Sequence, residues 1–251
     1  MGEPTRWQRR VEEFVLGQIG DPPARVLEVG CGKGELARSL AHAGHCVTAI
    51  DPRAPEGLIF RRGGIEEFSD PEPFDHVVAS LSLHHVEDLG RALGKIADLL
   101  RAGGTLVVVE FAWDRIDEAT AQWALERLPA ATPSGKPSWL AHCCRGWAPR
   151  GGEGGSHDHA DYAEAHLAGW ASEESLHDSG RVRAELERYF VERHFEWVPY
   201  LYPDLGEGVS ETDERAAIEA GTINATGFHY VGTVALEEAH LGRTGRTLAE
   251  P

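Results

Sequence analysis

A turn with three alternate glycines is the first feature of the chain that could do chemistry. The stretch VLEVGCGKG over 26–34 runs from a short apolar segment through an acidic residue into the glycines, and a helical pattern begins at Glu35. Glycines permit a tight turn and let backbone N–H groups at the start of a helix approach a bound group closely. A dinucleotide-binding turn has the spacing G-x-G-x-x-G, whereas the third glycine here comes one position early, so the spacing disfavours NAD.

An aspartate follows the next predicted strand. Asp51 stands twenty-one residues after Gly30, at the end of the strand pattern over 46–50. At the carboxyl edge of a parallel sheet, such a carboxylate can accept both hydroxyl groups of a ribose. The pair Asp51-Pro52 is also a common turn signal, so a purely structural cap is the alternative. Together with the glycine turn, Asp51 predicts a site for a sugar-bearing cofactor.

Histidines and cysteines gather in a later stretch that is dense in Gly, Pro, His and Trp. It contains His142, His157, His159, His166, Cys143 and Cys144. Imidazole and thiolate are zinc ligands, but adjacent cysteines do not easily serve one tetrahedral site and no partner stands at a motif spacing, so we predict no metal site. Proton transfer suits these residues better. His142, His157 and His166 are the candidate catalytic bases that could accept a proton from a hydroxyl or amine.

The elements that must position these residues alternate between strands and helices. Strand patterns cover 25–29, 46–51, 58–61, 74–79 and 105–109, and helical patterns cover 5–19, 35–43 and 88–101. This alternation predicts an α/β fold with a doubly wound, Rossmann-like, mostly parallel sheet. Two further strand patterns, 194–201 and 228–236, are joined by a connection too short for an ordinary crossover helix. We therefore expect an antiparallel pair at the end of the chain.

The domain organisation is predicted from where this regular alternation stops. We expect an N-terminal helix over 1–24, a cofactor-binding core over 25–112, a lid over 113–175 that binds the substrate, a segment over 176–238 that completes the core with a helix and the last two strands, and a flexible tail over 239–251. Within the lid, only 117–128 has a helical pattern and the rest reads as irregular. An irregular segment of this length inside a compact domain is usually functional.

Charge and composition exclude several classes of protein. The 251 residues include 24 Lys and Arg against 41 Asp and Glu, a formal net charge of −17. A bare nucleic-acid-binding domain should be basic instead. No apolar run approaches the roughly 20 residues that span a bilayer, so we expect no membrane association. Four cysteines without a disulfide pattern, and a polar start of the chain, predict a cytoplasmic protein with reduced thiols.

Four stretches together resemble the class I S-adenosylmethionine (SAM)-dependent methyltransferases that act on small molecules. They are the glycine turn at 28–34, Asp51, the segment FDHVVASLSLHHVED over 74–88 and the turn LLRAGGTLV over 99–107. The resemblance covers about residues 25–111 and resumes loosely at the last two strands. It implies a seven-stranded sheet whose last strand lies beside the fifth, SAM as the cofactor and S-adenosylhomocysteine (SAH) as its product.

The resemblance also implies which residues hold SAM. The turn residues Glu28, Gly30, Cys31, Gly32 and Gly34 would hold the methionine portion, and Asp51 would hold the ribose. The family often has an acidic residue two positions past the third strand for the adenine amino group, but Gly64 stands there. Ile65, or Glu66 as a substitute, would hold the adenine instead. Ser80 and His85 would border the cofactor, although packing or backbone positioning explains the pair His84 and His85 as well as catalysis does.

The activity implied by the resemblance is transfer of a methyl group to an O, N or C nucleophile of a small-molecule acceptor, natural products included. Three alternatives stay open. They are a SAM-binding enzyme of this fold that catalyses a cyclisation or rearrangement, a protein or tRNA methyltransferase, which the acidic charge disfavours, and a non-catalytic module that senses the cofactor, which the aromatic and histidine residues of the lid disfavour. The aromatic residues of the lid suit either its core or a concave site for a flat, apolar or cationic acceptor; they are Trp113, Trp123, Trp139, Trp147, Tyr162 and Trp170. The oligomeric state is open, a homodimer being one option.

Overall fold

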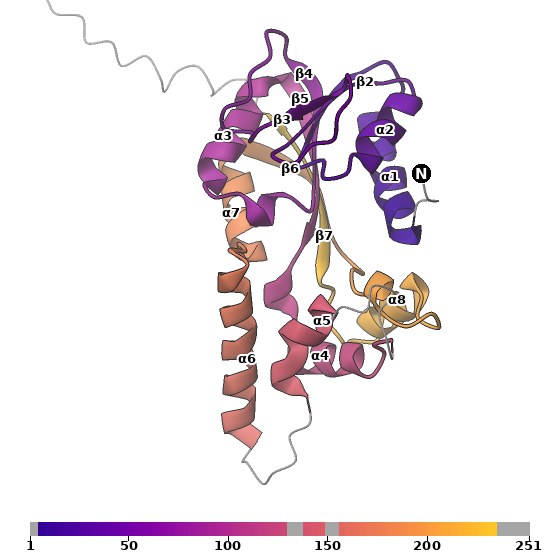
Figure 1. Cartoon of the computed structure of the whole chain (residues 1–251), viewed down its shortest axis with the longest axis vertical. Coiled ribbons are helices and arrows are strands. Elements are labelled where there is room, and N and C mark those ends of the chain that lie inside the picture. Colours follow the sequence, from indigo (N-terminus) through magenta and orange to yellow (C-terminus); the bar gives the residue numbers. More distant parts are fainter. Residues whose placement is uncertain (1–4, 130–137, 149–155, 235–251) are drawn as a thin grey trace, which may run out of the picture.

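A seven-stranded sheet forms the centre of the molecule. The computed structural model describes residues 5–129, 138–148 and 156–234, with only the backbone described over 156–160 (Figure 1). The strands are β1 (Arg25–Val29), β2 (Cys46–Asp51), β3 (Phe60–Arg62), β4 (Phe74–Ser80), β5 (Leu100–Phe111), β6 (Phe190–Val198) and β7 (Gly227–Val234). Their order is β3-β2-β1-β4-β5-β7-β6. Strands β1 to β5 pair in parallel, and β7 is antiparallel to both β5 and β6. The predicted fold class is therefore confirmed, including the last strand beside the fifth.

Helices cover both faces of the sheet. Figure 1 shows α1 (Arg6–Ile19) and α2 (Glu35–His42) on one side, and α3 (Leu89–Leu99) and α7 (Ser179–Tyr189) on the other. Alternate residues of the buried strands pack against the two helix layers, because successive side chains of a strand point to opposite faces of the sheet. In β4, for example, Val78 packs with the α1 and α2 layer, whereas Val77 packs with the α3 and α7 layer. None of the helices in the described ranges is long and apolar enough to cross a membrane.

Two insertions beyond the carboxyl edge of the sheet pack on each other. After β5 the chain forms η2 (Trp113–Arg115), α4 (Glu118–Leu125), α5 (Trp139–Cys143), η3 (Cys144–Trp147) and α6 (Ser156–Glu173), and between β6 and β7 it forms η4 (Tyr202–Asp204) and α8 (Glu211–Glu219). Both insertions contribute to one apolar cluster, which includes Trp123, Leu140, Trp170, Leu201 and Ile223. In Figure 1 these elements lie below the sheet, apart from the helices that flank it. This apolar cluster is a small core of its own, separate from the apolar clusters on the two faces of the sheet.

The lid contains more helix than the sequence analysis expected. Residues 156–173 form α6, a helix of 18 residues, where we expected irregular chain. Its buried residues Ala163, Leu167, Trp170 and Ala171 recur at a helical spacing and lie against the lid core. The glycine-rich stretch before the helix and the polar first turns obscured this spacing.

The boundaries of two strands also differ from expectation. Strand β5 extends over Leu100–Phe111 rather than 105–109, and β6 begins at Phe190 rather than at 194. Strand β6 is an edge strand, and its residues Val191, Glu192 and Arg193 are exposed. An edge strand with charged residues lacks the apolar alternation by which strands are recognised in a sequence.

Candidate functional site

Two cavities meet at the glycine turn, on the edge of the sheet where the parallel strands end. The first has a volume of about 860 Å³ and the second about 700 Å³, and both are lined by Gly30, Gly32 and Leu81. Most of the residues predicted to bind the cofactor line one of them: Asp51, Ile65, Glu66 and His85 the first, and Glu28, Cys31 and Ser80 the second. Residues from widely separated parts of the sequence are thus brought to one place.

Gly30 brings the glycine turn against the turn that follows β4. Its φ is +76°, and a Cβ atom built there would lie only 2.3 Å from the Cβ atom of Ser82. A side chain at this position would therefore force the two turns apart. The N–H groups of Gly30 and Cys31 both donate to the carbonyl of Ile50, at 2.8 and 3.1 Å. The glycine turn is held in this way between the ends of β2 and β4.

Gly34 differs from the other predicted cofactor residues, because it lines neither cavity. It has φ of +79°, and a Cβ atom there would lie 2.4 Å from the ring of Phe60. The position therefore requires glycine for the close packing of the start of α2 on β3. Gly34 thus lies against Phe60 and is not part of the wall of either cavity.

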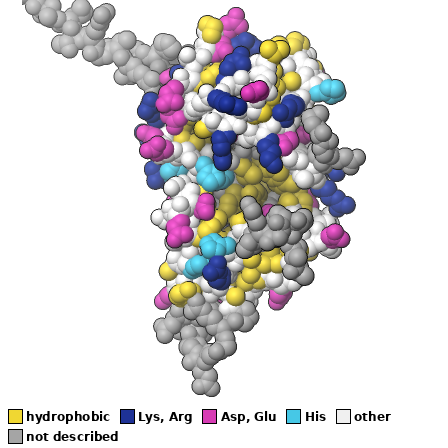
Figure 2. Space-filling view, in the orientation of Figure 1, with side chains coloured by type: hydrophobic (Ala, Val, Ile, Leu, Met, Phe, Trp, Pro, Cys, Tyr) yellow, Lys and Arg dark blue, Asp and Glu magenta, His cyan; other side chains and the backbone are white. Residues whose placement is uncertain are grey.

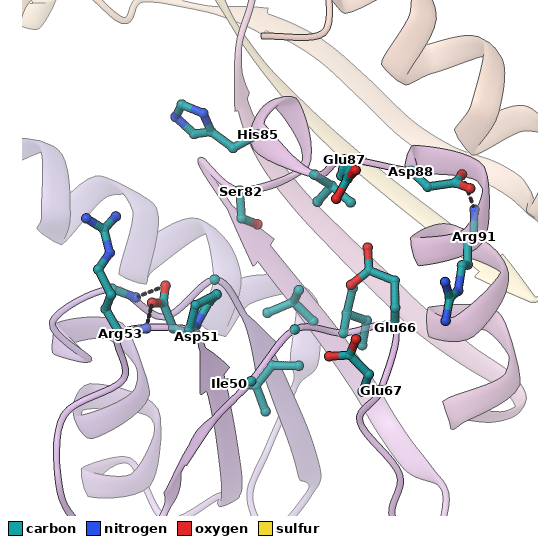
Figure 3. A pocket seen from close by; sticks show the side chains of 18 of the residues that line it. Ile50, Asp51, Arg53, Glu66, Glu67, Ser82, His85, Glu87, Asp88 and Arg91 are labelled. Carbon is teal, nitrogen blue, oxygen red and sulfur yellow. Dashed lines mark hydrogen bonds between the residues drawn. The ribbon is translucent and has the colours of Figure 1, made fainter. Parts of the chain in front are cut away.

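The Asp51 carboxylate connects the end of β2 to the glycine turn. Its Oδ2 atom accepts a hydrogen bond from the Gly32 N–H at 3.0 Å, and its Oδ1 atom accepts one from the Arg53 N–H at 2.7 Å (Figure 3). The hydrogen bond from Arg53 is the contact of a structural turn, which was the alternative to ribose binding for Asp51 in the sequence analysis. An ionised carboxylate offers about four lone-pair sites. Two of them are left for other donors, so the turn contact and a ribose contact are compatible.

Glu28 is a buried carboxyl group with an unused hydrogen-bonding atom. It is 3% exposed, lines the second cavity, and its Oε2 atom has no hydrogen-bond partner among the described residues. Burial raises the pKa of Glu28 to about 8 and that of the neighbouring Cys31 thiol to about 12. A cationic amino group in the cavity would supply the missing partner and favour the ionised form of Glu28.

Carboxylates dominate the wall of the first cavity. Five acidic side chains line it against two arginines, a formal charge of 2 − 5 = −3: Asp51, Glu66, Glu67, Glu87 and Asp88 against Arg53 and Arg91. Figure 3 shows Glu66 and Glu67 across Ile50 from Asp51, so acidic groups stand beside the position where Gly64 replaces the family's acidic residue. This wall would repel the pyrophosphate of a dinucleotide and attract a cation. It disfavours NAD on a ground independent of the glycine spacing.

The turn after β4 contains two cavity residues that the sequence analysis did not single out. Leu81 lines both cavities and has φ of +50°, a conformation that leucine seldom adopts and that is found most often at functional sites. Ser82 lines the first cavity and contacts Gly30. The run Ser80, Leu81, Ser82 between a buried strand and two histidines was the available signal.

A buried glutamate at the end of β5 holds this turn. Glu110 is 1% exposed and accepts hydrogen bonds from the N–H groups of Ser82 and Leu83, at 2.9 and 2.6 Å. It also bonds Nδ1 of His84, which lies in η1 (Leu83–His85). Burial opposes the protonation of His84, but the charge and hydrogen bond of Glu110 outweigh it and raise the pKa of His84. A single acidic residue after a β-branched run was the sequence signal for this role.

The same turn is joined to the end of the lid. His177 donates its backbone N–H to the His84 carbonyl at 2.9 Å, and its Nε2 atom bonds the Val86 carbonyl at 2.7 Å. His85 in turn bonds the backbone of Glu174, and partial burial together with the neighbouring His84 lowers the pKa of His85. A movement at the end of the lid would therefore also move the turn after β4, which lines the first cavity.

The predicted catalytic histidines lie in the lid. His166 Nε2 bonds the backbone carbonyl of His142 at 3.0 Å, and their rings are 6.0 Å apart. Neither residue lines the two cavities. His157 belongs to the first turn of α6, but its side chain is outside the described residues. Within the described ranges, no group of three or more His, Cys, Asp or Glu side chains is placed to hold a metal ion.

The lid and the sheet edge enclose a hydrophobic hollow. Figure 2 shows apolar side chains gathered in a depression between the upper body of the molecule and the lid. Of the aromatic lid residues, Trp123, Trp147 and Trp170 are buried in the lid core, while Trp113 and Trp139 are partly buried against it. Trp139 packs edge-on against Phe111, the last residue of β5, at 5.3 Å between ring centres. The lid thus contributes an aromatic wall next to the end of β5.

Comparison with known proteins identifies the family. A family model described as a methyltransferase domain matches residues 3–144, more than half of the chain. The chain belongs to the methyltransferase family. Its seven-stranded sheet is that of the class I, SAM-dependent methyltransferases, as the resemblance of the four sequence stretches implied.

Curated relatives match a part of this methyltransferase. A methyltransferase of Mycobacterium tuberculosis is 39% identical over 101 residues, covering 34% of this chain and 50% of the relative. A ubiquinone biosynthesis O-methyltransferase of Xylella fastidiosa is 33% identical over 158 residues, covering 52% of this chain and 64% of the relative. The chain thus spans between half and just under two thirds of the length of these relatives.

Solved structures share the fold of the methyltransferase. The N-methyltransferase NodS from Bradyrhizobium japonicum, solved in complex with SAH, has a TM-score of 0.50 and 17% identity, covering 92% of this chain and 89% of that chain. SAM is the cofactor of the family. The residues of the cavity pair are compatible with a positively charged cofactor: Asp51 has free lone pairs, Glu28 has an Oε2 atom without a partner among the described residues, and the first cavity has an acidic wall.

Proposed function

We propose that the protein transfers the methyl group of SAM to an O, N or C nucleophile of a small-molecule acceptor, as a cytoplasmic enzyme of biosynthesis. The observation that carries this proposal is that the two cavities meet at the glycine turn. Asp51 lines the first cavity and Glu28 lines the second. The hydrophobic hollow between the upper body of the molecule and the lid supports a small acceptor over a macromolecule. The net charge of −17 disfavours a polyanion such as tRNA.

In this proposal the chain mainly binds and orients. Glu28 binds the amino group of the methionine portion, and the free lone pairs of Asp51 accept the two ribose hydroxyls. Ile65 packs on the adenine, or Glu66 accepts a hydrogen bond from the adenine amino group as a substitute for the acidic residue that is absent at Gly64. When bound, SAM supplies a methyl group on a positively charged sulfur, which is already reactive toward nucleophiles. Ideal proximity and orientation can supply roughly 7–11 kcal/mol of the barrier.

A base is needed only where the acceptor must lose a proton as the methyl group transfers. We keep His142, His157 and His166 as the candidates for this role, which would add about 10²- to 10⁴-fold to the rate. His142 and His166 line neither of the first two cavities, so their role as a base stays a prediction. Ser80, Gly30 and Gly32 belong to the cofactor side of the reaction, as their place in the cavity walls supports.

Transfer of labelled methyl groups tests the proposal. Purified protein is incubated with methyl-labelled SAM and pools of small hydroxy, amino and carbon-acid compounds, with total RNA and unfolded protein in parallel. We expect label in one or more small-molecule pools and a product mass increased by one methyl group. Label only in RNA or protein, or a changed product without added mass, would contradict the proposal.

A further inference from the structure

Aromatic side chains from four separate segments meet at Tyr200, in the connection after β6. The Tyr200 ring stacks on Phe111 of β5 with 4.6 Å between ring centres. Trp7 of α1 lies edge-on at 6.4 Å, and Trp139 of α5 lies at 6.3 Å. Tyr200 and the two tryptophans are only partly buried. We call these four side chains the Tyr200 cluster.

A buried carboxylate fixes the backbone at Tyr200. Glu214 of α8 is fully buried and accepts hydrogen bonds from the N–H groups of Tyr200, Leu201 and Tyr202, at 2.8, 3.1 and 2.7 Å. Burial of a carboxyl group is costly unless such donors compensate for it. The segment that presents the Tyr200 ring is therefore rigidly positioned, as a binding surface needs to be.

The Tyr200 cluster adjoins a third cavity. This cavity has a volume of about 340 Å³ and is lined by both Trp7 and Tyr200. Trp7 and Val11 line it as well as the second cavity, where Glu28 lies. The two cavities therefore adjoin along α1, next to the proposed methionine end of the cofactor site. The volume is within the usual range of small-molecule sites.

The surroundings of the cluster are acidic. Four glutamates line the third cavity against two arginines, and both of these, Arg10 and Arg215, already bond Glu211 at 2.8 Å. Asp204, an exposed residue of η4, accepts a hydrogen bond from the Trp139 side chain. Burial, then the charges of Asp204 and Glu110, raise the pKa of the Tyr200 hydroxyl. The carboxylates of Asp204 and Glu110 thus both act on the Tyr200 side chain.

We propose that the Tyr200 cluster and the cavity beside it bind the acceptor, and that the acceptor is an organic cation: an amine protonated at neutral pH, attached to an apolar or aromatic body. Aromatic faces and carboxylates both attract cations, and the apolar body would occupy the hydrophobic hollow. The inference rests on the proposed function and adds the chemical class of the acceptor. It concerns recognition and holds whichever atom of the acceptor receives the methyl group.

Binding of three matched probes to the SAH-loaded protein tests this proposal. Phenethylamine, 2-phenylethanol and 3-phenylpropionate have similar bodies but carry a positive, a neutral and a negative group at pH 7. Dissociation constants are measured by tryptophan fluorescence, with SAH binding measured separately by calorimetry. We expect phenethylamine to bind about tenfold more tightly than the alcohol, and the carboxylate to bind most weakly.

Two variants locate the effect. Asp204→Asn should weaken binding of phenethylamine but leave the binding of 2-phenylethanol unchanged. Glu207→Gln is the matched control, because it removes one exposed negative charge from the same connection, and it should change neither. Equal or tighter binding of the alcohol or the carboxylate, no binding of the amine, or equal effects of the two variants would overturn the proposal. Failure of SAH itself to bind would instead count against the proposed function on which it rests.

Discussion

Glu28 should make cofactor binding depend on pH. With a pKa of about 8 it is mostly protonated at pH 7 in the free protein, since burial disfavours its charged form. An amino group bound beside it favours the carboxylate, so binding releases the proton. Affinity for SAH should therefore rise between pH 6 and pH 8, by up to about tenfold per pH unit. Calorimetry in buffers of different ionisation enthalpy measures both the affinity and the released proton.

The variant Glu28→Gln provides the control for this prediction. Glutamine keeps the size of the side chain but cannot ionise, so the pH dependence and the proton release should both disappear, with weaker binding at pH 8. A proton release that persists in the variant would assign it to another group and contradict the role of Glu28.

At the scale of elements, the pair of Glu110 and His84 holds the turn after β4. Replacing Glu110 by alanine removes the side-chain partner of three N–H groups, of which those of Leu83 and Phe111 are buried, and of the buried His84 imidazole. We expect a loss of about 3–5 kcal/mol in the free energy of unfolding, measured by urea denaturation. The exposed pair His194 and Glu196, 3.8 Å apart, is the matched control. Glu196→Ala should cost less than about 1 kcal/mol.

The same pair predicts how stability changes with pH. The pKa of His84 is raised in the folded protein above its usual value. The stability it contributes is fully present below the unfolded pKa and is lost as the pH rises through the folded pKa. Wild-type protein should lose this contribution on the alkaline side of pH 6.5, and Glu110→Ala should lack it. An identical pH dependence in both proteins would contradict the assignment.

How well each element could be predicted depended on whether its signal was local. The glycine turn and Asp51 were recognisable because short spacings encode strand, turn and helix. The Glu110 and His84 pair joins the end of β5 to the turn after β4, and the Tyr200 cluster joins α1 to the connection after β6. No local pattern shows such contacts. The glycine spacing also does not reveal that Phe60 packs against Gly34, whose assignment to the cofactor stays a prediction.

At the scale of the whole molecule, charge should favour SAM over its product at low salt. SAM has a net positive charge, SAH has none, and the first cavity has a formal charge of −3 within a chain of −17. Raising the ionic strength from about 0.01 M to about 1 M shortens the Debye length from about 30 Å to about 3 Å. SAM affinity should then fall by about threefold or more relative to SAH affinity. Calorimetry at both salt concentrations measures this, and an equal salt dependence for the two ligands would contradict it.

The most direct test of the cofactor site is calorimetric titration of SAH and NAD into wild-type protein, Asp51→Ala and the control Asp21→Ala, which removes an exposed carboxylate that lines none of the three cavities. We predict that SAH binds and NAD does not. Loss of the ribose contacts in Asp51→Ala should weaken SAH binding by about tenfold or more, with Asp21→Ala unchanged. No binding of SAH, preference for NAD, or an Asp51→Ala variant that binds SAH as well as wild type does would contradict this account of the site.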